Sequence, residues 1–93
     1  MVIQAPPGVA VREVKLHLFY HDGDMMTLEH AQLEEIGQDK LFPEVVDMVV
    51  ATQKERIWQY TVRIALVNRQ VIRFTYQIED NKAKFIRKDE YKE

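Results

Sequence analysis

The residues with the clearest chemical potential in this sequence are four cations in its C-terminal part, Arg63, Arg73, Lys84 and Lys88. They fall on the polar row of segments in which apolar and polar residues alternate, so strands would project them from one face of a sheet. Ile86 is the apolar residue of the last strand expected beside them. Such a face suits an acidic protein partner or a phosphate backbone, but an ordinary solvated face has the same composition. We expect a solvated face first, then a protein interface, because the aromatic residues that would stack on bases lie on the other row.

A second group of polar residues lies between residues 21 and 30. His21, Asp22, Asp24, Glu29 and His30 are all of types that bind metal ions. Their spacing matches neither HExxH nor the ligand ladder of a calcium loop. Asp-Gly-Asp is also the composition of a tight turn. The sequence therefore predicts a turn and a solvated surface here, with no metal site.

Motifs for covalent catalysis and phosphate binding are missing from the sequence. It contains no cysteine and no serine, and its three glycines are isolated from one another. These facts exclude thiolate and serine nucleophiles and glycine-rich phosphate loops. Glu34 and Glu35 are adjacent on an expected helix and point apart, so we expect both to face solvent. We predict no catalytic residue and no cofactor, and favour a protein that is not an enzyme.

The region from residue 56 to residue 88 predicts three strands. Two long alternating runs begin at Trp58 and Ile72, and a shorter run follows from Ala83. Aromatic and β-branched residues dominate them, as half-buried strands prefer. The residues expected in the core share one parity and face a stripe of valines: Trp58, Tyr60, Val62, Ile64, Phe74, Tyr76 and Phe85, against Val46, Val49 and Val50.

Two turns set the expected register of these strands. A three-residue loop, Asn68-Arg69-Gln70, is expected between the first two strands, because a two-residue loop would pair Ile64 with Arg73 and mix the faces. Asp80-Asn81 suits a type I′ turn between the last two. The resulting pairs are Ile64 with Phe74, Val62 with Tyr76, Glu79 with Lys82, Ile78 with Ala83, and Tyr76 with Phe85.

The N-terminal half predicts an arm, a strand and a helical region. Prolines and a glycine in residues 1–11 indicate an extended arm, followed by a single domain over residues 12–93. Alternation predicts a strand over residues 12–20. Residues 25–36 are ambiguous, because Asp22-Gly23 favours a hairpin with a second strand, whereas Leu28 and the helix formers after it favour a helix. We favour the helix, capped by Thr27 and ended by Gly37.

A second helix is expected from Pro43, which suits a first turn. Its buried stripe comprises Val45, Val46, Val49 and Val50, with Met48. The predicted fold is α+β and two-layered: an N-terminal strand, one or two helices, and a three-stranded antiparallel meander packed on the helices.

Composition and charge bound the possible partners. No apolar run approaches the roughly 20 residues of a membrane span, no signal peptide is evident, and the absence of cysteine fits a cytoplasmic protein. Residues 1–55 carry 4 basic and 10 acidic side chains, a net of −6, whereas residues 56–93 carry 9 and 5, a net of +4. Internal pairing is the simplest explanation. The alternative is a bipolar molecule that stacks head to tail or offers its basic half to an anionic partner.

The order of strand, helix pair and three-stranded meander resembles the RelE/ParE toxin family. The final segment IEDNKAKFIRKDEY is similar to the last hairpin of that family, which also ends in a basic-aromatic stretch. Family members cut ribosome-bound mRNA or target gyrase, so the resemblance implies a ribonuclease-type toxin that uses the basic face. The chain departs from the family in being acidic overall, and no motif carries over a catalytic residue.

We therefore predict a small non-enzymatic binding or regulatory module that acts through protein–protein contacts. Its partner is another protein or a second copy, as in a homodimer, and the strand from Ala83 would offer an open sheet edge for self-association. We expect neither nucleic acid nor a membrane as its partner. The RelE/ParE-like toxin is the alternative function.

Overall fold

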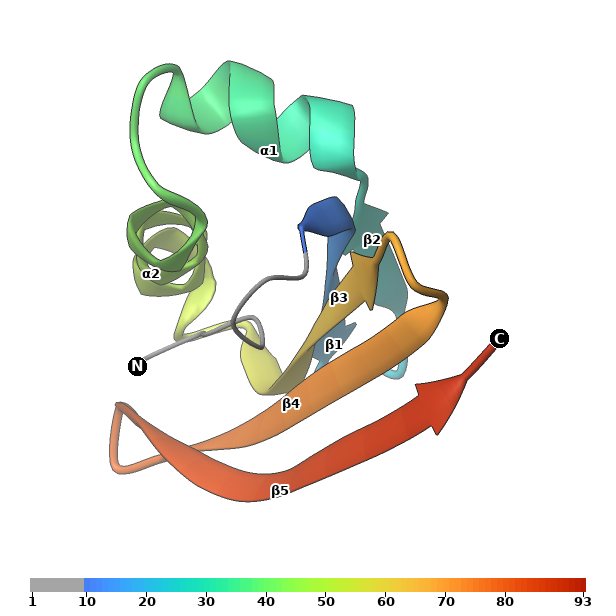
Figure 1. Cartoon of the computed structure of the whole chain (residues 1–93). Coiled ribbons are helices and arrows are strands. Elements are labelled where there is room, and N and C mark those ends of the chain that lie inside the picture. Colours follow the sequence, from blue (N-terminus) through green and yellow to red (C-terminus); the bar gives the residue numbers. More distant parts are fainter. Residues whose placement is uncertain (1–9) are drawn as a thin grey trace.

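The computed structural model describes residues 10–93, and it consists of a five-stranded antiparallel sheet with two helices (Figure 1). The strand order across the sheet is β2-β1-β3-β4-β5. The elements along the chain are β1 (Val11–Tyr20), β2 (Met25–Leu28), α1 (His30–Gly37), α2 (Phe42–Gln53), β3 (Ile57–Leu66), β4 (Gln70–Glu79) and β5 (Lys82–Lys92). The predicted α+β class is confirmed, and β2 is an additional strand. Of the predicted arm, residues 1–9 lie outside the described residues, and Val11 belongs to β1.

The ambiguous segment after β1 contains both of the structures considered for it. Asp22-Gly23 forms the turn of a β1–β2 hairpin, in which Gly23 has a φ of 94° and the Asp24 amide donates to Asp22 Oδ1 at 2.9 Å. The predicted helix is confirmed only from residue 30 onward. The Thr27 cap is wrong, because Glu29 precedes α1 and its amide donates to Gln32 Oε1 at 2.8 Å.

The start of α1 is fixed to the sheet by a histidine. His30 Nδ1 accepts a hydrogen bond from the Val14 amide of β1 at 3.0 Å. The imidazole proton therefore lies on Nε2, which faces the Glu34 carboxylate at 2.6 Å. One side chain thus joins the first turn of the helix to the strand beneath it.

The end of α1 packs directly on α2. Gly37 is the last residue of α1, as predicted, but the left-handed residue that follows is Gln38, with a φ of 53°. A Cβ atom at residue 37 would collide with the buried side chain of Val45. Glycine is therefore needed at this position for the close approach of two helices.

The second helix buries valines as expected. Pro43 lies in its first turn, and Val45, Val46 and Val50 are buried, with Val49 packed against the core. Met48 was predicted in this stripe but is 40% exposed. Neither helix of residues 10–93 is long and apolar enough to cross a membrane.

The predicted register is correct for one of the two hairpins and wrong for the other. Asp80 and Asn81 have positive φ angles of 51° and 63°, and every pair predicted around this type I′ turn is confirmed. The first loop has an odd number of residues, as predicted, but comprises residues 67–69, with Arg69 at a φ of 72°. The pairs predicted across it are therefore wrong by two residues. The observed pairs keep the same faces: Ile64 with Ile72, Val62 with Phe74, and Tyr60 with Tyr76.

Two predicted core residues lie at the surface, Trp58 because of an irregularity in strand pairing and Phe85 because no helix covers it. Between β1 and β3 the register shifts at Trp58, so Ile57 takes the buried position and Trp58 is 42% exposed. Between β4 and β5 the register shifts at Ile86, and Phe85, although paired as predicted, is 52% exposed. β5 lies away from the helices (Figure 1). The core assignments of Trp58 and Phe85 were therefore wrong, whereas the other five strand residues predicted there are buried.

Candidate functional site

The sheet face opposite the helices, here called the open face, contains a hollow of about 410 Å³. It brings together Arg63 and Arg73, which the sequence had singled out. Sequence reasoning also placed Thr61 on this face, but it missed the lining residues from β1, β2 and β5. The lining is Lys15, His17, Phe19, Met25, Thr61, Arg63, Arg73 and Tyr91. Alternation along β1 was visible in the sequence, but its pairing with β3 was not, so Lys15 and His17 could not be placed beside Arg63.

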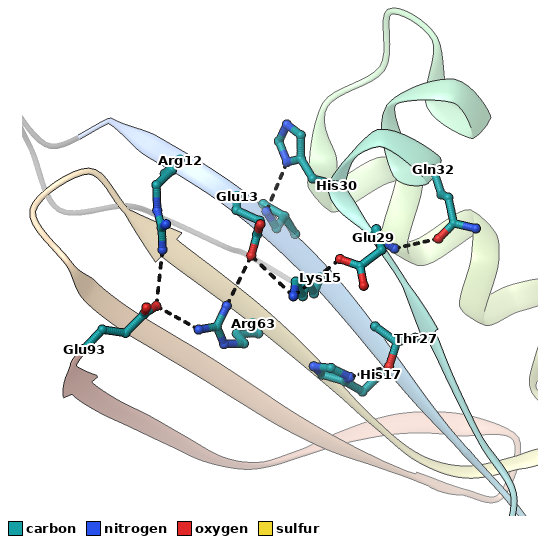
Figure 2. Close-up of polar contacts among 11 residues, drawn as sticks. Arg12, Glu13, Lys15, His17, Thr27, Glu29, His30, Gln32, Arg63 and Glu93 are labelled. Carbon is teal, nitrogen blue, oxygen red and sulfur yellow. Dashed lines mark hydrogen bonds and ion pairs between the residues drawn. The ribbon is translucent and has the colours of Figure 1, made fainter.

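A chain of ion pairs crosses one end of the open face (Figure 2). The Arg63 guanidinium contacts Glu93 Oε1 at 2.8 Å and Glu13 Oε1 at 3.4 Å. Glu93 also contacts Arg12 at 3.2 Å. Lys15 continues the chain, with its Nζ 3.6 Å from Glu13 and 3.4 Å from Glu29. The Arg63 and Lys15 charges are therefore compensated by carboxylates within the molecule.

The other predicted cations are paired as well. Arg73 lies 3.8 Å from Asp89, Lys84 lies 3.2 Å from Glu79, and Lys88 lies 3.0 Å from Glu90. The predicted basic face is thus a face of alternating charge. An anionic partner would have to displace these carboxylates or bind beside them, and both weaken its net attraction.

Lys88 does not lie on the same face as Arg73. The register shift at Ile86 pairs Lys88 with Phe74, and its Nζ lies 5.9 Å from the centre of that ring, on the helix side of the sheet. Asp89 takes the position opposite Arg73 instead. The prediction that the four cations share one face is wrong for Lys88, because one extra residue reverses the parity of every residue after it.

His17 lies inside the hollow and hydrogen-bonds Thr27 Oγ1 at 2.9 Å. Burial lowers the pKa of His17, and the nearby charges of Lys15 and Arg63 lower it further. The neighbouring Tyr91 is the main cause that raises the pKa of Arg63, and Glu93 raises it further. The hollow therefore combines an uncharged imidazole with permanently charged guanidinium groups, an arrangement that can hold an anion and accept a proton.

Three of the five residues considered as metal ligands have structural roles. Asp22 accepts the Asp24 amide in the hairpin turn, Glu29 pairs with Lys15, and His30 uses both ring nitrogens inside the fold. No three metal-binding side chains converge anywhere in residues 10–93.

A different kind of surface lies between the helices and β2. It is an apolar groove of about 530 Å³, called here the groove. Three of its large apolar residues are exposed: Met26 by 48%, Ile36 by 45% and Met48 by 40%. None of the residues that line it is charged: Leu18, Met26, Leu28, Ile36, Met48, Val49, Ala51, Thr52 and Gln53.

The segment of the chain that forms most of the groove is acidic. Residues 22–54, which include every lining residue except Leu18, carry eight carboxylates and two lysines. Two of these carboxylates, Glu29 and Glu34, contact Lys15 and His30. The other six form no ion pair with any residue from 10 to 93: Asp22, Asp24, Glu35, Asp39, Glu44 and Asp47.

The sequence contained a weak signal for the groove. Met25-Met26 follows the hairpin turn, and Met48 interrupts a helix face otherwise composed of valines. Because Met48 was assigned to the core, its exposure was not anticipated. No family model matches the chain, and no curated protein or solved structure is similar enough to count as a match.

Proposed function

We propose that this protein is a non-enzymatic binding module, and that it holds a basic, apolar segment of another polypeptide in the groove. The observation that carries this proposal is an uncharged groove, lined by half-exposed Met26, Ile36 and Met48, in an acidic region. Small domains expose few contiguous apolar surfaces, and those that they do expose commonly bind other proteins.

The groove residues suit a peptide ligand better than a small molecule. Methionine side chains are flexible and polarisable, so they adapt to the irregular apolar face of a bound segment. Covering one half-exposed side chain of this size contributes about 1 kcal/mol. Three such residues together can support moderate affinity, before the cost of ordering the segment.

The charge expected of the ligand follows from the charge of the segment that forms most of the groove. Residues 22–54, which supply most of the groove, contain six carboxylates that form no ion pair within residues 10–93, and their two lysines, Lys40 and Lys54, balance only part of this charge. Lysine and arginine residues on the ligand would gain from this field, whereas an acidic segment would be repelled. Among polypeptide segments with an apolar face, those that also carry basic residues should therefore bind best.

Calorimetric titration with model peptides tests the proposal. The probes are an 18-residue amphipathic helix of leucine and lysine and its counterpart of leucine and glutamate. We expect the lysine peptide to bind and the glutamate peptide not to bind. The double substitution Ile36→Gln/Met48→Gln should weaken binding about tenfold, since it makes the groove polar without changing net charge.

The matched control is Leu41→Gln/Val67→Gln, which removes two exposed apolar residues, 71% and 60% accessible, outside the groove. It should bind the lysine peptide as the native chain does. Equal weakening by both double substitutions, or no weakening by either, would show that the peptide binds through charge alone and would remove the groove from the proposal.

A second candidate function is a RelE/ParE-like ribonuclease, favoured by the hollow on the open face. Lys15, Arg63 and Arg73 line it together with His17 and Tyr91. Cations can hold a phosphate there, while a neutral imidazole can accept a proton. The carboxylates paired with each cation make this the weaker candidate.

Binding of single-stranded RNA at several salt concentrations tests this second candidate. A phosphate-binding face requires affinity that falls steeply with salt, because each contact releases a counterion. Arg63→Gln/Arg73→Gln should then abolish binding. We expect instead no measurable binding at physiological salt, and salt-sensitive micromolar affinity lost in this variant would favour the ribonuclease over the binding module.

A further inference from the structure

One histidine of α1 completes the hydrogen bonding of β1. β2 pairs with β1 only as far as Leu28, which lies opposite Leu16. The Val14 amide is the next donor on the same edge of β1, because amides two residues apart along a strand point the same way. β2 ends before it reaches Val14, and His30 Nδ1 accepts the hydrogen bond at 3.0 Å (Figure 2). The imidazole therefore replaces the acceptor that a longer β2 would have supplied.

This hydrogen bond requires an uncharged imidazole. The Val14 amide is the donor, so Nδ1 must offer a lone pair, and the single ring hydrogen lies on Nε2. In the charged imidazolium both ring nitrogens carry hydrogens, and Nδ1 can no longer accept. Histidine side chains at their ordinary pKa gain this charge between about pH 8 and pH 5. Acidification in that range therefore removes the acceptor of the Val14 amide.

The groups that face the ring come from three elements. From α1, the Glu34 carboxylate lies 2.6 Å from Nε2 and attracts the imidazolium more than the neutral ring. From α2, the uncharged Phe42 ring lies with its centre 5.0 Å away, and Lys40 lines a cavity together with Phe42 and Glu34. From β1, the Val14 amide favours the neutral ring. Glu34 can therefore keep its contact in both forms, whereas the Val14 contact exists in only one.

We propose that the Val14–His30 hydrogen bond is a pH-sensitive latch, which holds the first turn of α1 on β1 while the imidazole is neutral and releases that turn when the ring is protonated. The effect is confined to the first turn, because Leu33 is fully buried in the core and anchors the rest of the helix. The other contact of this turn with β1 is the ion pair of Glu29 with Lys15, at 3.4 Å. Both side chains of that pair are partly exposed, so it holds the turn only weakly.

Residue-resolved NMR of the native chain at about pH 7.5 and pH 5 tests the latch. At the higher pH the His30 ring should be neutral with its hydrogen on Nε2. By the lower pH the exchange protection of the Val14 amide, corrected for the intrinsic effect of pH, should fall at least about tenfold. The Val62 amide reports global stability, since β3 pairs with strands on both sides, and its protection should change much less.

His30→Asn is the matched control. Asparagine can place Oδ1 where Nδ1 lies, accepts the same hydrogen bond and gains no charge on acidification. Val14 of this variant should remain protected at both pH values, whereas His30→Ala, which lacks an acceptor, should leave it unprotected at both. If a variant does not fold, the comparison of Val14 with Val62 in the native chain decides. Protection of Val14 that persists at the lower pH overturns the inference. So does a parallel loss at Val14 and Val62, or the same loss in His30→Asn.

The latch has a consequence for the groove that rests on the proposed function. Leu28 and Ile36, on either side of His30 in the chain, line the groove, so release of the turn should change its shape. The lysine peptide should then bind the native chain several-fold more weakly at the lower pH, and His30→Asn with little change. If the peptide binds at neither pH while Val14 loses protection, only the proposed function is wrong. If the peptide binds and Val14 stays protected, only the latch is wrong.

Discussion

β3 and β5 carry similar alternating patterns, but only β3 lies under the helices. Tyr60, Val62 and Ile64 of β3 are at most 1% exposed, whereas Phe85 of β5 is 52% exposed on the same side of the sheet. β5 lies away from both helices (Figure 1). Alternation therefore identifies a strand and its two rows, but burial depends on whether another layer lies above that strand.

A row of aromatic side chains shows how burial decreases from β3 to β5. Tyr60 and Tyr76 stack with ring centres 5.0 Å apart, and Phe85 meets Tyr76 edge-on at 5.6 Å. Burial raises the pKa of both tyrosines, more strongly for Tyr60. The row thus begins in the core at β3 and ends at the surface on β5.

Two phenylalanine substitutions give the largest expected contrast. Phe74→Ala, at a 9% exposed position, should lower the free energy of unfolding by about 3–5 kcal/mol. Phe85→Ala should cost about 1 kcal/mol or less, mostly from its edge contact with Tyr76. Urea unfolding followed by circular dichroism measures both. Similar costs at the two positions would mean that β5 is covered in solution.

Replacing the glycine between the helices tests whether the covering layer depends on close packing. Gly37→Ala should destabilise the protein by about 1–3 kcal/mol, because the new methyl group collides with buried Val45. At an open helical position the same change would stabilise by about 0.5–1 kcal/mol. A lower melting temperature for Gly37→Ala would therefore support close packing of the two helices at this position. A higher melting temperature would contradict it.

The sequence was informative where structure is determined locally. Asp80-Asn81 defined its turn and the pairs beside it, because the backbone angles of two residues fix that geometry. The valines after Pro43 likewise indicated a buried helix face. These features need no knowledge of the rest of the chain.

The wrong predictions concern residues whose face or burial depends on one inserted residue or on contacts distant in the sequence. Trp58 and Lys88 were assigned by parity, and a register shift next to each reversed it. The pairing of Arg63 with Glu13 and Glu93 depends on contacts 50 and 30 residues apart in the chain. Alternation contains no information about such partners, so the charge compensation of the open face could not be predicted.

The smallest predicted effect concerns pH and the uncovered side of β1. The pKa of His17 in the folded protein lies below its ordinary value of 6.5, so the unfolded chain binds a proton more readily. The stabilising contribution is complete above pH 6.5 and is lost as the pH falls through the lower folded value. His17→Gln should make the urea midpoint less sensitive to pH between about 7.5 and 5. An unchanged pH dependence would assign the effect to other groups.

The outward position of Trp58 determines what its fluorescence reports. It is the single tryptophan of the chain, and its ring lies 6.5 Å from that of Phe19, which lines the hollow of the open face. A half-exposed indole emits at longer wavelength than a core indole, so unfolding should change the emission of this protein only modestly. A molecule that binds against Phe19 would shift that emission, whereas a segment that enters the groove would leave it nearly unchanged. The native chain therefore already contains an optical probe that distinguishes its two candidate surfaces.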